Sequence, residues 1–373
     1  MKNLGTIYRM KEDSIGSPSM YLGANIKEWA VQDEFGKCTT CYAMGSSSYV
    51  KESIWIVEGL MAKYNFSHTS AKRNGRFSPS SSTDYHPELD STKYLNDEWI
   101  TVYQNLMLRW ICELGRIDII HESTLLSQYM IQPRVGHLNQ ALNIFKYLKT
   151  SDLNGWLLFD PFDFDIEWNP FRTDESPPDE RADAMSKLYP DSTDELPPHM
   201  PESLGNPINI NCFVDSDHAG NRVTRWSHTG IVIFVNIAPI IWLCKKQNTV
   251  ESSSYGSEFI ALRIACEMID ALWYKLRMLG VPLKGPARMM CDNASVVYNG
   301  SFPESTIKKE TSIHMLPLCT WICGIQEDTA NLWMVQIQYC RLIDQSINSQ
   351  SSKTIDWQCI ILIIFCANHC YVN

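Results

Sequence analysis

The chain has 373 residues, 45% of them hydrophobic, which is enough apolar material for two domains or one large one. A formal net charge of -10 argues against a general nucleic-acid binder, because such proteins present basic surfaces. Thirteen irregularly spaced cysteines and no recognisable signal peptide argue against a disulfide-rich secreted protein and favour an intracellular one, in the cytoplasm or nucleus.

The first 150 residues are expected to be mainly helical. The stretch SYVKESIWIVEGL, residues 48–60, has helical spacing, and between Trp99 and Leu148 apolar residues recur every three or four positions. Cys38 and Cys41 form a lone CxxC motif. A structural zinc site needs four ligands, and no second pair follows at finger spacing, so a zinc-binding interaction module is only a minor alternative.

The hydrophobic pattern changes after an acidic, Pro-rich segment, residues 151–208, which is expected to be a linker. The runs INCFVD, GIVIFVNI and PIIWLCKK predict a three-stranded antiparallel meander. The residues from Ser252 to Gly280 then predict a long helix with serine caps and a glycine stop. Its expected apolar face comprises Ala261, Ala265, Met268, Leu272, Leu276 and Leu279. ARMMCDN predicts a fourth strand, and ASVVYNG a short helix.

Three acidic residues mark these elements: Asp215 at a strand end, Glu258 in the first turns of the long helix, and Asp292 at the next strand end. Any one of them alone is more commonly a turn, cap or helix-dipole residue. Together they could converge at one edge of an α/β sheet. Clustered carboxylates repel one another, and a pair of Mg²⁺ ions that grips a phosphate is the usual reason to assemble them.

Several motifs in combination resemble one family. FVDSDHAGN, SHTGIVIFVNIAPIIWLCKKQ, SSYGSEFIAL, YKLRMLGVPLKGP and CDNASV are similar to the ribonuclease H domain of copia-type (Ty1/copia) LTR retrotransposon Pol polyproteins. Upstream, YLGANI, YVKESI, YHPELD, LRWICELGRIDI, PRVGHL and IFKYLK resemble the region between that family's polymerase palm and its ribonuclease H domain. The resemblance implies an α/β fold with a ribonuclease H-like mixed sheet and flanking helices, preceded by a mainly helical partial reverse-transcriptase remnant.

The expected division of the chain follows from this resemblance. Residues 1–150 would be a thumb- or connection-like remnant of reverse transcriptase, 151–208 the linker, 209–309 a truncated ribonuclease H-like domain, and 310–373 a tail. No adjacent Asp-Asp pair occurs in the chain, so the metal-binding pair of a polymerase palm is missing.

The resemblance also implies a site. Asp215 matches the first catalytic carboxylate of the family, and Glu258 and Asp292 match the second and third, which would hold two Mg²⁺ ions. Asp217 and His218 belong to the family signature without being assigned as ligands. The implied reaction is hydrolysis of the RNA strand of an RNA–DNA hybrid, with the hybrid and the remaining Pol domains as partners and no membrane.

Two departures from the family affect this expectation. The family usually has basic residues at the places of Trp226 and His228. After ESTIKK it continues as [RK]HQSICYH and later N-x-ADLLTK, whose Asp is the fourth metal-site carboxylate. This chain has ETSIHMLP and QYCRLIDQ instead, and both can encode the family motifs after a one-base shift of the reading frame. Residues 310–373 are therefore predicted to be an out-of-frame translation.

The alternative function is a catalytically inactive remnant, at most a weak binder of nucleic acid. Cys340 and Arg341 stand where the fourth carboxylate is expected, and the sheet is expected to lack its final elements. Without a palm to pack on, the helices from Trp99 to Leu148 are expected to expose apolar surface. The apolar run from Cys359 to Cys366 is far shorter than the ~20 residues of a membrane-spanning helix.

Overall fold

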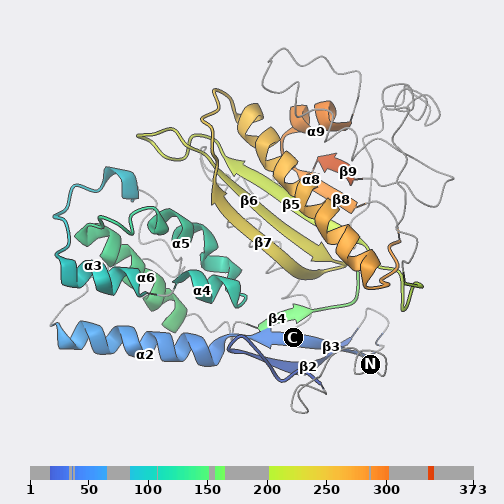
Figure 1. The fold of residues 1–373 in the computed structure, drawn as a ribbon, viewed down its shortest axis with the longest axis horizontal. Coiled ribbons are helices and arrows are strands. Elements are labelled where there is room, and N and C mark those ends of the chain that lie inside the picture. Colours follow the sequence, from blue (N-terminus) through green and yellow to red (C-terminus); the bar gives the residue numbers. More distant parts are fainter. Residues whose placement is uncertain are drawn as a thin grey trace.

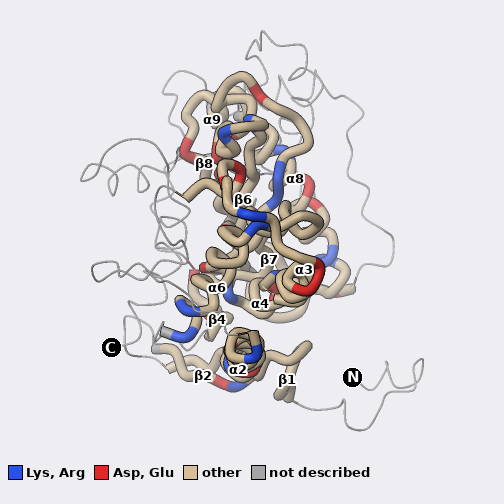
Figure 2. The backbone as a smooth tube through the Cα atoms, turned by 90° about the vertical axis from the view of Figure 1, so that its left-hand side faces the viewer, with Lys and Arg blue, Asp and Glu red and all other residues tan. Residues whose placement is uncertain are grey.

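The computed structural model describes residues 17–32, 36, 38–64, 85–106, 108–150, 156–163, 201–284, 287–301 and 335–339. In these residues the fold is mixed α/β, with two separate sheets and several helices (Figure 1). Among the described helices, none combines the length and apolar character that crossing a membrane requires. Helix α3 (Asp97–Gln104) has acidic residues in its first turn, and α8 (Ser254–Met278) has basic residues in its last turn. The described part of the chain therefore carries both signs of charge (Figure 2).

The larger sheet has five strands in the order β7-β6-β5-β8-β9. Its strands are β5 (Ile210–Asp217), β6 (His228–Val235), β7 (Ala238–Lys246), β8 (Ala287–Cys291) and β9 (Val335–Tyr339). The first three form an antiparallel meander, and β8 lies parallel to β5. The predicted meander and the predicted fourth strand are therefore confirmed.

Strand β5 lies at the centre of this sheet. It is buried along nearly its whole length, as expected for a continuous apolar run between two hydrogen-bonded neighbours. The strand continues to Asp217, and Asp215 pairs with Gly230 of β6. Asp215 thus lies two positions inside the strand and not at its end, because the antiparallel pairing with β6 extends past it.

Helix α8 packs along β5 and runs across the sheet (Figure 1). It begins after Ser253, whose side chain accepts a hydrogen bond from the backbone N–H of Gly256 at 3.3 Å. Gly280 follows the helix with φ of +73°, a conformation that favours glycine. Leu279, predicted on the apolar face, is instead 73% exposed, since the helix ends at Met278.

The part before residue 150 contains the predicted helices. They are α2 (Ser47–Lys63), α3, α4 (Leu108–Glu113), α5 (Ile120–Ser127) and α6 (Val135–Thr150), with short 3-10 turns at Pro87–Leu89 and Ile117–Ile119. The expectation of a mainly helical segment is incomplete, because the structure adds a four-stranded antiparallel sheet in the order β1-β2-β3-β4. Its strands are β1 (Met20–Tyr21), β2 (Ala24–Gln32), β3 (Cys38–Gly45) and β4 (Trp156–Phe159).

Strand β4 corrects one expectation about the linker. Residues 156–159 fall inside the segment 151–208, yet their apolar run pairs with β3, with Trp156 opposite Gly45. The side chain of Asp163 also reaches the larger sheet, since it accepts a hydrogen bond from Asn209 and lies 3.1 Å from Arg288. Residues 164–200 of the predicted linker lie outside the described residues.

The hydrophobic core lies on both faces of the larger sheet. In β5 the alternation of side chains sends Cys212 and Val214 into a cluster with α8, and Phe213 into a second cluster with the N-terminal helices. Trp242 of β7 donates its indole N–H to the carbonyl of Cys112 in α4 at 3.1 Å. The expectation that the helices between Trp99 and Leu148 expose apolar surface is therefore wrong for most of that surface, because the sheet of the same chain covers it, although Trp110 is 39% exposed.

The C-terminal part differs from expectation in one element. After α9 (Ala294–Ser301), strand β9 pairs in parallel with β8, from Ala287 opposite Val335 to Cys291 opposite Tyr339. A fifth strand therefore occupies the sheet edge that was expected to be empty. Residues 302–334 and 340–373, including Cys359 to Cys366, lie outside the described residues, and the out-of-frame origin of the tail stays a prediction.

Candidate metal centre

The three predicted acids come from two adjacent parallel strands and the helix that crosses them. Val214 of β5 lies opposite Cys291, the last residue of β8. Asp215 and Asp292 come next after these two residues in the chain, so they follow the same register. Glu258 is the fifth residue of α8 and belongs to its buried face. That face is defined by the helical repeat and includes Phe259, Ala261, Leu262, Ala265, Ile269 and Leu272. The packing that buries this helix thus also points Glu258 at the sheet.

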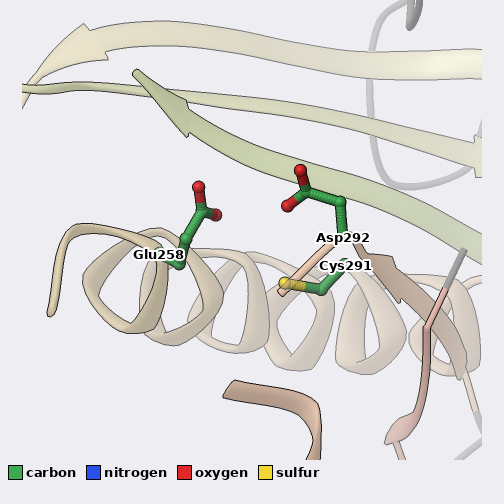
Figure 3. A group of neighbouring side chains, drawn as sticks. All are labelled: Glu258, Cys291 and Asp292. Carbon is green, nitrogen blue, oxygen red and sulfur yellow. The ribbon is translucent and has the colours of Figure 1, made fainter. Parts of the chain in front are cut away.

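The structure brings the predicted acids together. Ligand atoms of Glu258, Cys291 and Asp292 all lie within 4.8 Å of one another. Glu258 rises from α8 and Asp292 reaches from the end of β8, so both carboxyl groups face the space between helix and sheet (Figure 3). Sequence reasoning missed Cys291 in this group, although its position directly before Asp292 was the available signal.

Burial and mutual repulsion dominate the electrostatics of the site. Asp215 is 4% exposed and Glu258 is 5% exposed. Burial, and secondly the negative charge of Asp292, raise the pKa of Asp215, although the backbone N–H of Ser216 donates to its Oδ1 at 2.7 Å. Burial, and then the charges of Asp215 and Asp292, raise the pKa of Glu258. Without a compensating cation, the three carboxyl groups are therefore not all ionised at neutral pH.

The donor atoms at this site suit a hard divalent cation. Glu258 Oε2 is buried and has no hydrogen-bond partner within the described part of the chain. A buried carboxylate oxygen without a hydrogen-bond donor destabilises the folded protein, but such an oxygen is a suitable ligand for Mg²⁺. Burial raises the pKa of the Cys291 thiol well above its usual range, and a sulfur ligand suits soft cations better than Mg²⁺. Asp215, Glu258 and Asp292 fit Mg²⁺.

The two signature residues after Asp215 have other roles. Asp217 accepts a hydrogen bond from the backbone N–H of His228, and its Oδ2 lies 3.1 Å from His228 Nδ1. A Cβ atom at Gly220 would lie 2.2 Å from Asp217 Oδ2, so only glycine leaves room for this carboxylate. His218 Nδ1 lies 3.3 Å from Ser257 Oγ, beside the first turn of α8. The signature therefore builds the turn next to the site.

A buried glutamine links the elements that carry the acids. Gln247 Nε2 donates to Thr229 Oγ1 of β6 at 3.0 Å and to the carbonyl of Ser257 in α8 at 2.9 Å, and it lies 3.4 Å from Ser216 Oγ. This network fixes the start of α8, and with it Glu258, against the strands. The sequence analysis did not single out Gln247, and its only signal was a polar residue directly after the last strand of the meander.

The structure shows the surroundings of Trp226 and His228, where basic residues were expected from the resemblance. His228 is fully buried, so it does not face a bound nucleic acid. Lys246 Nζ lies 4.9 Å from the ring centroid of Trp226. The positive charge of Lys246 is therefore next to residue 226, although residue 226 itself is not basic. Lys245 and Lys246 are both exposed at the end of β7.

The CxxC motif does not form a common binding site. Cys38 and Cys41 lie in β3, and residues three apart in a strand point to opposite faces. Cys38 is exposed, whereas Cys41 is 6% exposed. Zinc binding by this pair is not supported in the described structure.

Comparison with known proteins supports the resemblance noted from the sequence. No family model matches the chain. Over 94 residues, 25% of the chain, it is 29% identical to the retrovirus-related Pol polyproteins from transposons RE1 and RE2 of Arabidopsis thaliana. Over 57 residues, 15% of the chain, it is 42% identical to the uncharacterized mitochondrial protein AtMg00810 of the same plant. These matches span 6% of each polyprotein and 24% of the mitochondrial protein. The resemblance to retrotransposon Pol polyproteins is thus confirmed over part of the chain.

Proposed function

We propose that this chain, which is homologous in part to retrotransposon Pol polyproteins, carries a ribonuclease H-type domain descended from the reverse transcriptase/ribonuclease H region of a copia-type polyprotein. Its substrate would be an RNA–DNA hybrid, of which it would cut the RNA strand. The observation that carries the proposal is the convergence of Glu258 and Asp292, with Asp215 beside them, in a space where a bound cation would allow all three carboxyl groups to ionise.

The topology of the larger sheet supports the same assignment. A strand with the first acid is followed by two antiparallel strands, a helix with the second acid, and a parallel strand that ends at the third. This is the order of elements that the sequence motifs implied for a ribonuclease H-like domain.

In the proposed mechanism the chain supplies a fixed set of oxygen donors. Two Mg²⁺ ions at this site would supply the charge that activates a water molecule and stabilises the leaving 3′-oxygen. The Ser216 N–H holds the carboxylate of Asp215, and Gln247 holds the helix turn next to Glu258. Both acids are therefore oriented before a substrate arrives, which lowers the reorganisation that the reaction requires.

Recognition of the hybrid would depend on its backbone and 2′-hydroxyl groups and not on base sequence. Exposed Lys245 and Lys246 at the end of β7 are suited to contact phosphates. The partners would be the hybrid and the other domains of a Pol polyprotein. The place of action would be the cytoplasm or nucleus.

The direct test is cleavage of a labelled RNA–DNA hybrid by the full chain, with and without Mg²⁺. We expect Mg²⁺-dependent cutting of the RNA strand that Asp292→Asn and Glu258→Gln each abolish. Glu267→Gln is the matched control, because Glu267 lies on an exposed part of the same helix, 3.7 Å from Arg263. Cleavage that survives both site variants, or that needs no metal, would disprove the assignment.

The competing function is a catalytically inactive remnant with at most weak nucleic-acid binding. It rests on the absence of a carboxylate at Cys340 and Arg341, which lie outside the described residues. A chain in which residues from Glu310 onward are replaced by the sequence of the shifted frame separates the two functions. If only this repaired chain cuts the hybrid, the present sequence is the inactive remnant.

A further inference from the structure

Side chains of the N-terminal helical part contact the connection between β5 and β6, residues 218–227, at Arg222 in its middle and at His228, the residue of β6 that directly follows it. We propose that Gln128 and Glu88 are positioning residues that fix this connection, and through it Asp217, beside the metal centre. The inference deepens the proposed function and rests on it. It assigns to the N-terminal part of the chain a role in the ribonuclease site that lies in the other part.

The first attachment is a chain of hydrogen bonds from α5 to β5. Gln128 directly follows α5, and its Nε2 lies 3.0 Å from His228 Nε2. Because an amide nitrogen donates, this ring nitrogen accepts, which leaves the ring proton on Nδ1. That proton is donated to Asp217 Oδ2 at 3.1 Å, while Asp217 Oδ1 accepts from the backbone of His228. Both oxygens of Asp217 are therefore engaged.

The engagement of Asp217 matters because Asp217 stands two residues from Asp215. Both residues belong to β5, and side chains two positions apart in a strand lie on the same face of the sheet. An Asp217 that swung free could approach the cation site as an additional carboxylate. The hydrogen bonds to His228 hold Asp217 away from the cation site, so only the three predicted ligands face the cation.

The second attachment holds the middle of the connection. Glu88 Oε1 accepts a hydrogen bond from the backbone N–H of Arg222 at 2.8 Å. The Glu88 side chain is only 9% exposed, and its 3-10 turn is fixed by a 2.9 Å contact between His137 Nε2 and the carbonyl of Pro87. Glu88 is thus a rigid acceptor, supplied by the motif YHPELD that the metal site itself does not use.

The connection is buried at Ala219, Asn221 and Ser227 but exposed at residues 222–225, and the attachment at Arg222 acts on this exposed part. Asn221 Oδ1 accepts from the backbone N–H groups of Val223 at 3.1 Å and Thr224 at 2.7 Å, which closes a local turn. Residues 222–225 are all exposed, so packing does not fix them. Arg222 and Arg225 lie in this stretch, so the attachments also decide where two cations stand relative to the carboxylates.

The experiment compares Gln128→Leu with Gln104→Leu in the full chain. Gln128 is exposed, so leucine leaves no cavity there, and Gln104 is a matched control because its amide bonds only the carbonyl of Met130 within the helical part, at 2.8 Å. Two quantities are measured: hydrogen exchange of the backbone amides of His228 and Arg222, and Mn²⁺ affinity by titration. We expect Gln128→Leu to accelerate exchange at His228 about tenfold and to weaken Mn²⁺ binding about tenfold. Gln104→Leu should change neither.

Glu88→Ala tests the second attachment in the same way, with faster exchange expected at Arg222. Unchanged exchange at both amides would overturn the proposal, and so would faster exchange with an unchanged Mn²⁺ affinity. If the unaltered chain binds no Mn²⁺, the proposed function fails. The roles of Gln128 and Glu88 in holding the connection are then tested by the exchange rates alone.

Discussion

Glu258 and Asp292 are 34 positions apart in the chain (292 − 258), yet their carboxyl oxygens lie within 4.8 Å of each other. The pair forms because the buried stripe of α8 crosses the sheet where β8 ends. Folding therefore forces two acids into one apolar space, and the raised pKa of Glu258 is the result. The proximity of these acids lowers the stability of the folded protein, and a bound cation would restore that stability.

Stability without metal should depend on pH in an unusual direction. In an unfolded chain carboxyl groups titrate near pH ~4, whereas the pKa values of Asp215 and Glu258 in the folded protein are raised by burial and by neighbouring carboxylates. Above pH ~4 the folded state therefore binds more protons than the unfolded state, so these groups make the free energy of unfolding fall as pH rises. We expect Mg²⁺ to raise Tm more at pH 8 than at pH 5. Equal increases in Tm at both values, measured by differential scanning calorimetry, would contradict the raised pKa values.

Asp292→Asn should remove activity and increase stability together. The substitution deletes one of the charges that oppose ionisation of Asp215 and Glu258. In EDTA at pH 8 we expect the free energy of unfolding to increase by roughly 1 kcal/mol, while the stabilisation by Mg²⁺ decreases. Urea unfolding of both proteins checks this. A variant less stable than the parent would show that Asp292 is mainly a structural residue.

Gly136 of α6 should not tolerate alanine. A Cβ atom there would lie 1.7 Å from Asp90 Oδ2. This oxygen accepts from Tyr85 Oη at 2.8 Å, and the other accepts from the N–H of Thr92 at 2.8 Å, so the carboxylate cannot move without losing hydrogen bonds. We expect Gly136→Ala to lower the free energy of unfolding by about 1–3 kcal/mol.

The matched control for this substitution is Gly59 in α2, where an added Cβ would meet no atom within 4 Å. Alanine is favoured over glycine in a helix by about 1 kcal/mol, so Gly59→Ala should stabilise the protein. Thermal or urea unfolding of both variants gives the comparison. The same sign of change in both would refute the role given to Asp90.

The contact between the N-terminal helices and the larger sheet can be tested at Trp242. Its indole N–H donates to the carbonyl of Cys112 at 3.1 Å, and phenylalanine would keep the ring but lose this bond. We expect Trp242→Phe to cost about 1 kcal/mol in the free energy of unfolding. Trp110→Phe is the control, because Trp110 is 39% exposed. Equal stabilities would mean that the two parts of the chain are not held together at this point.

The reading frame of the tail is decided by sequencing the transcript through the codons for Lys308 to Ser346. We expect the shifted frame to read HQSICYH and then NTADLLTK. A shifted frame without these motifs would mean that the C-terminal sequence is genuine. The pairing of β9 with β8 would then have to be explained by the residues as they stand.

The sequence by itself determined the elements from Ile210 to Ser301 and the choice of the three acids. The meander, the long helix and the following strand could be predicted because their signals are local. These signals are runs of β-branched residues for the strands, and a 3.6-residue apolar repeat with a glycine stop for the helix. The spacing of the motifs then marked Asp215, Glu258 and Asp292, and the structure places all three at one end of the same strands and helix. Local patterns could be read because short-range backbone preferences and burial favour the same elements here.

Only the tertiary structure decided what covers the second face of the sheet and what surrounds the acids. Phe213 and Trp242 meet the N-terminal helices, Trp156 pairs with Gly45 across a predicted linker, and Cys291 joins Glu258 and Asp292. Apart from the adjacency of Cys291 and Asp292, these contacts have no local signature, because they join residues separated by tens to more than a hundred positions. Long-range contacts depend on the shapes and packing of whole elements, and the periodicity of a single element shows which side is apolar but not what will cover it.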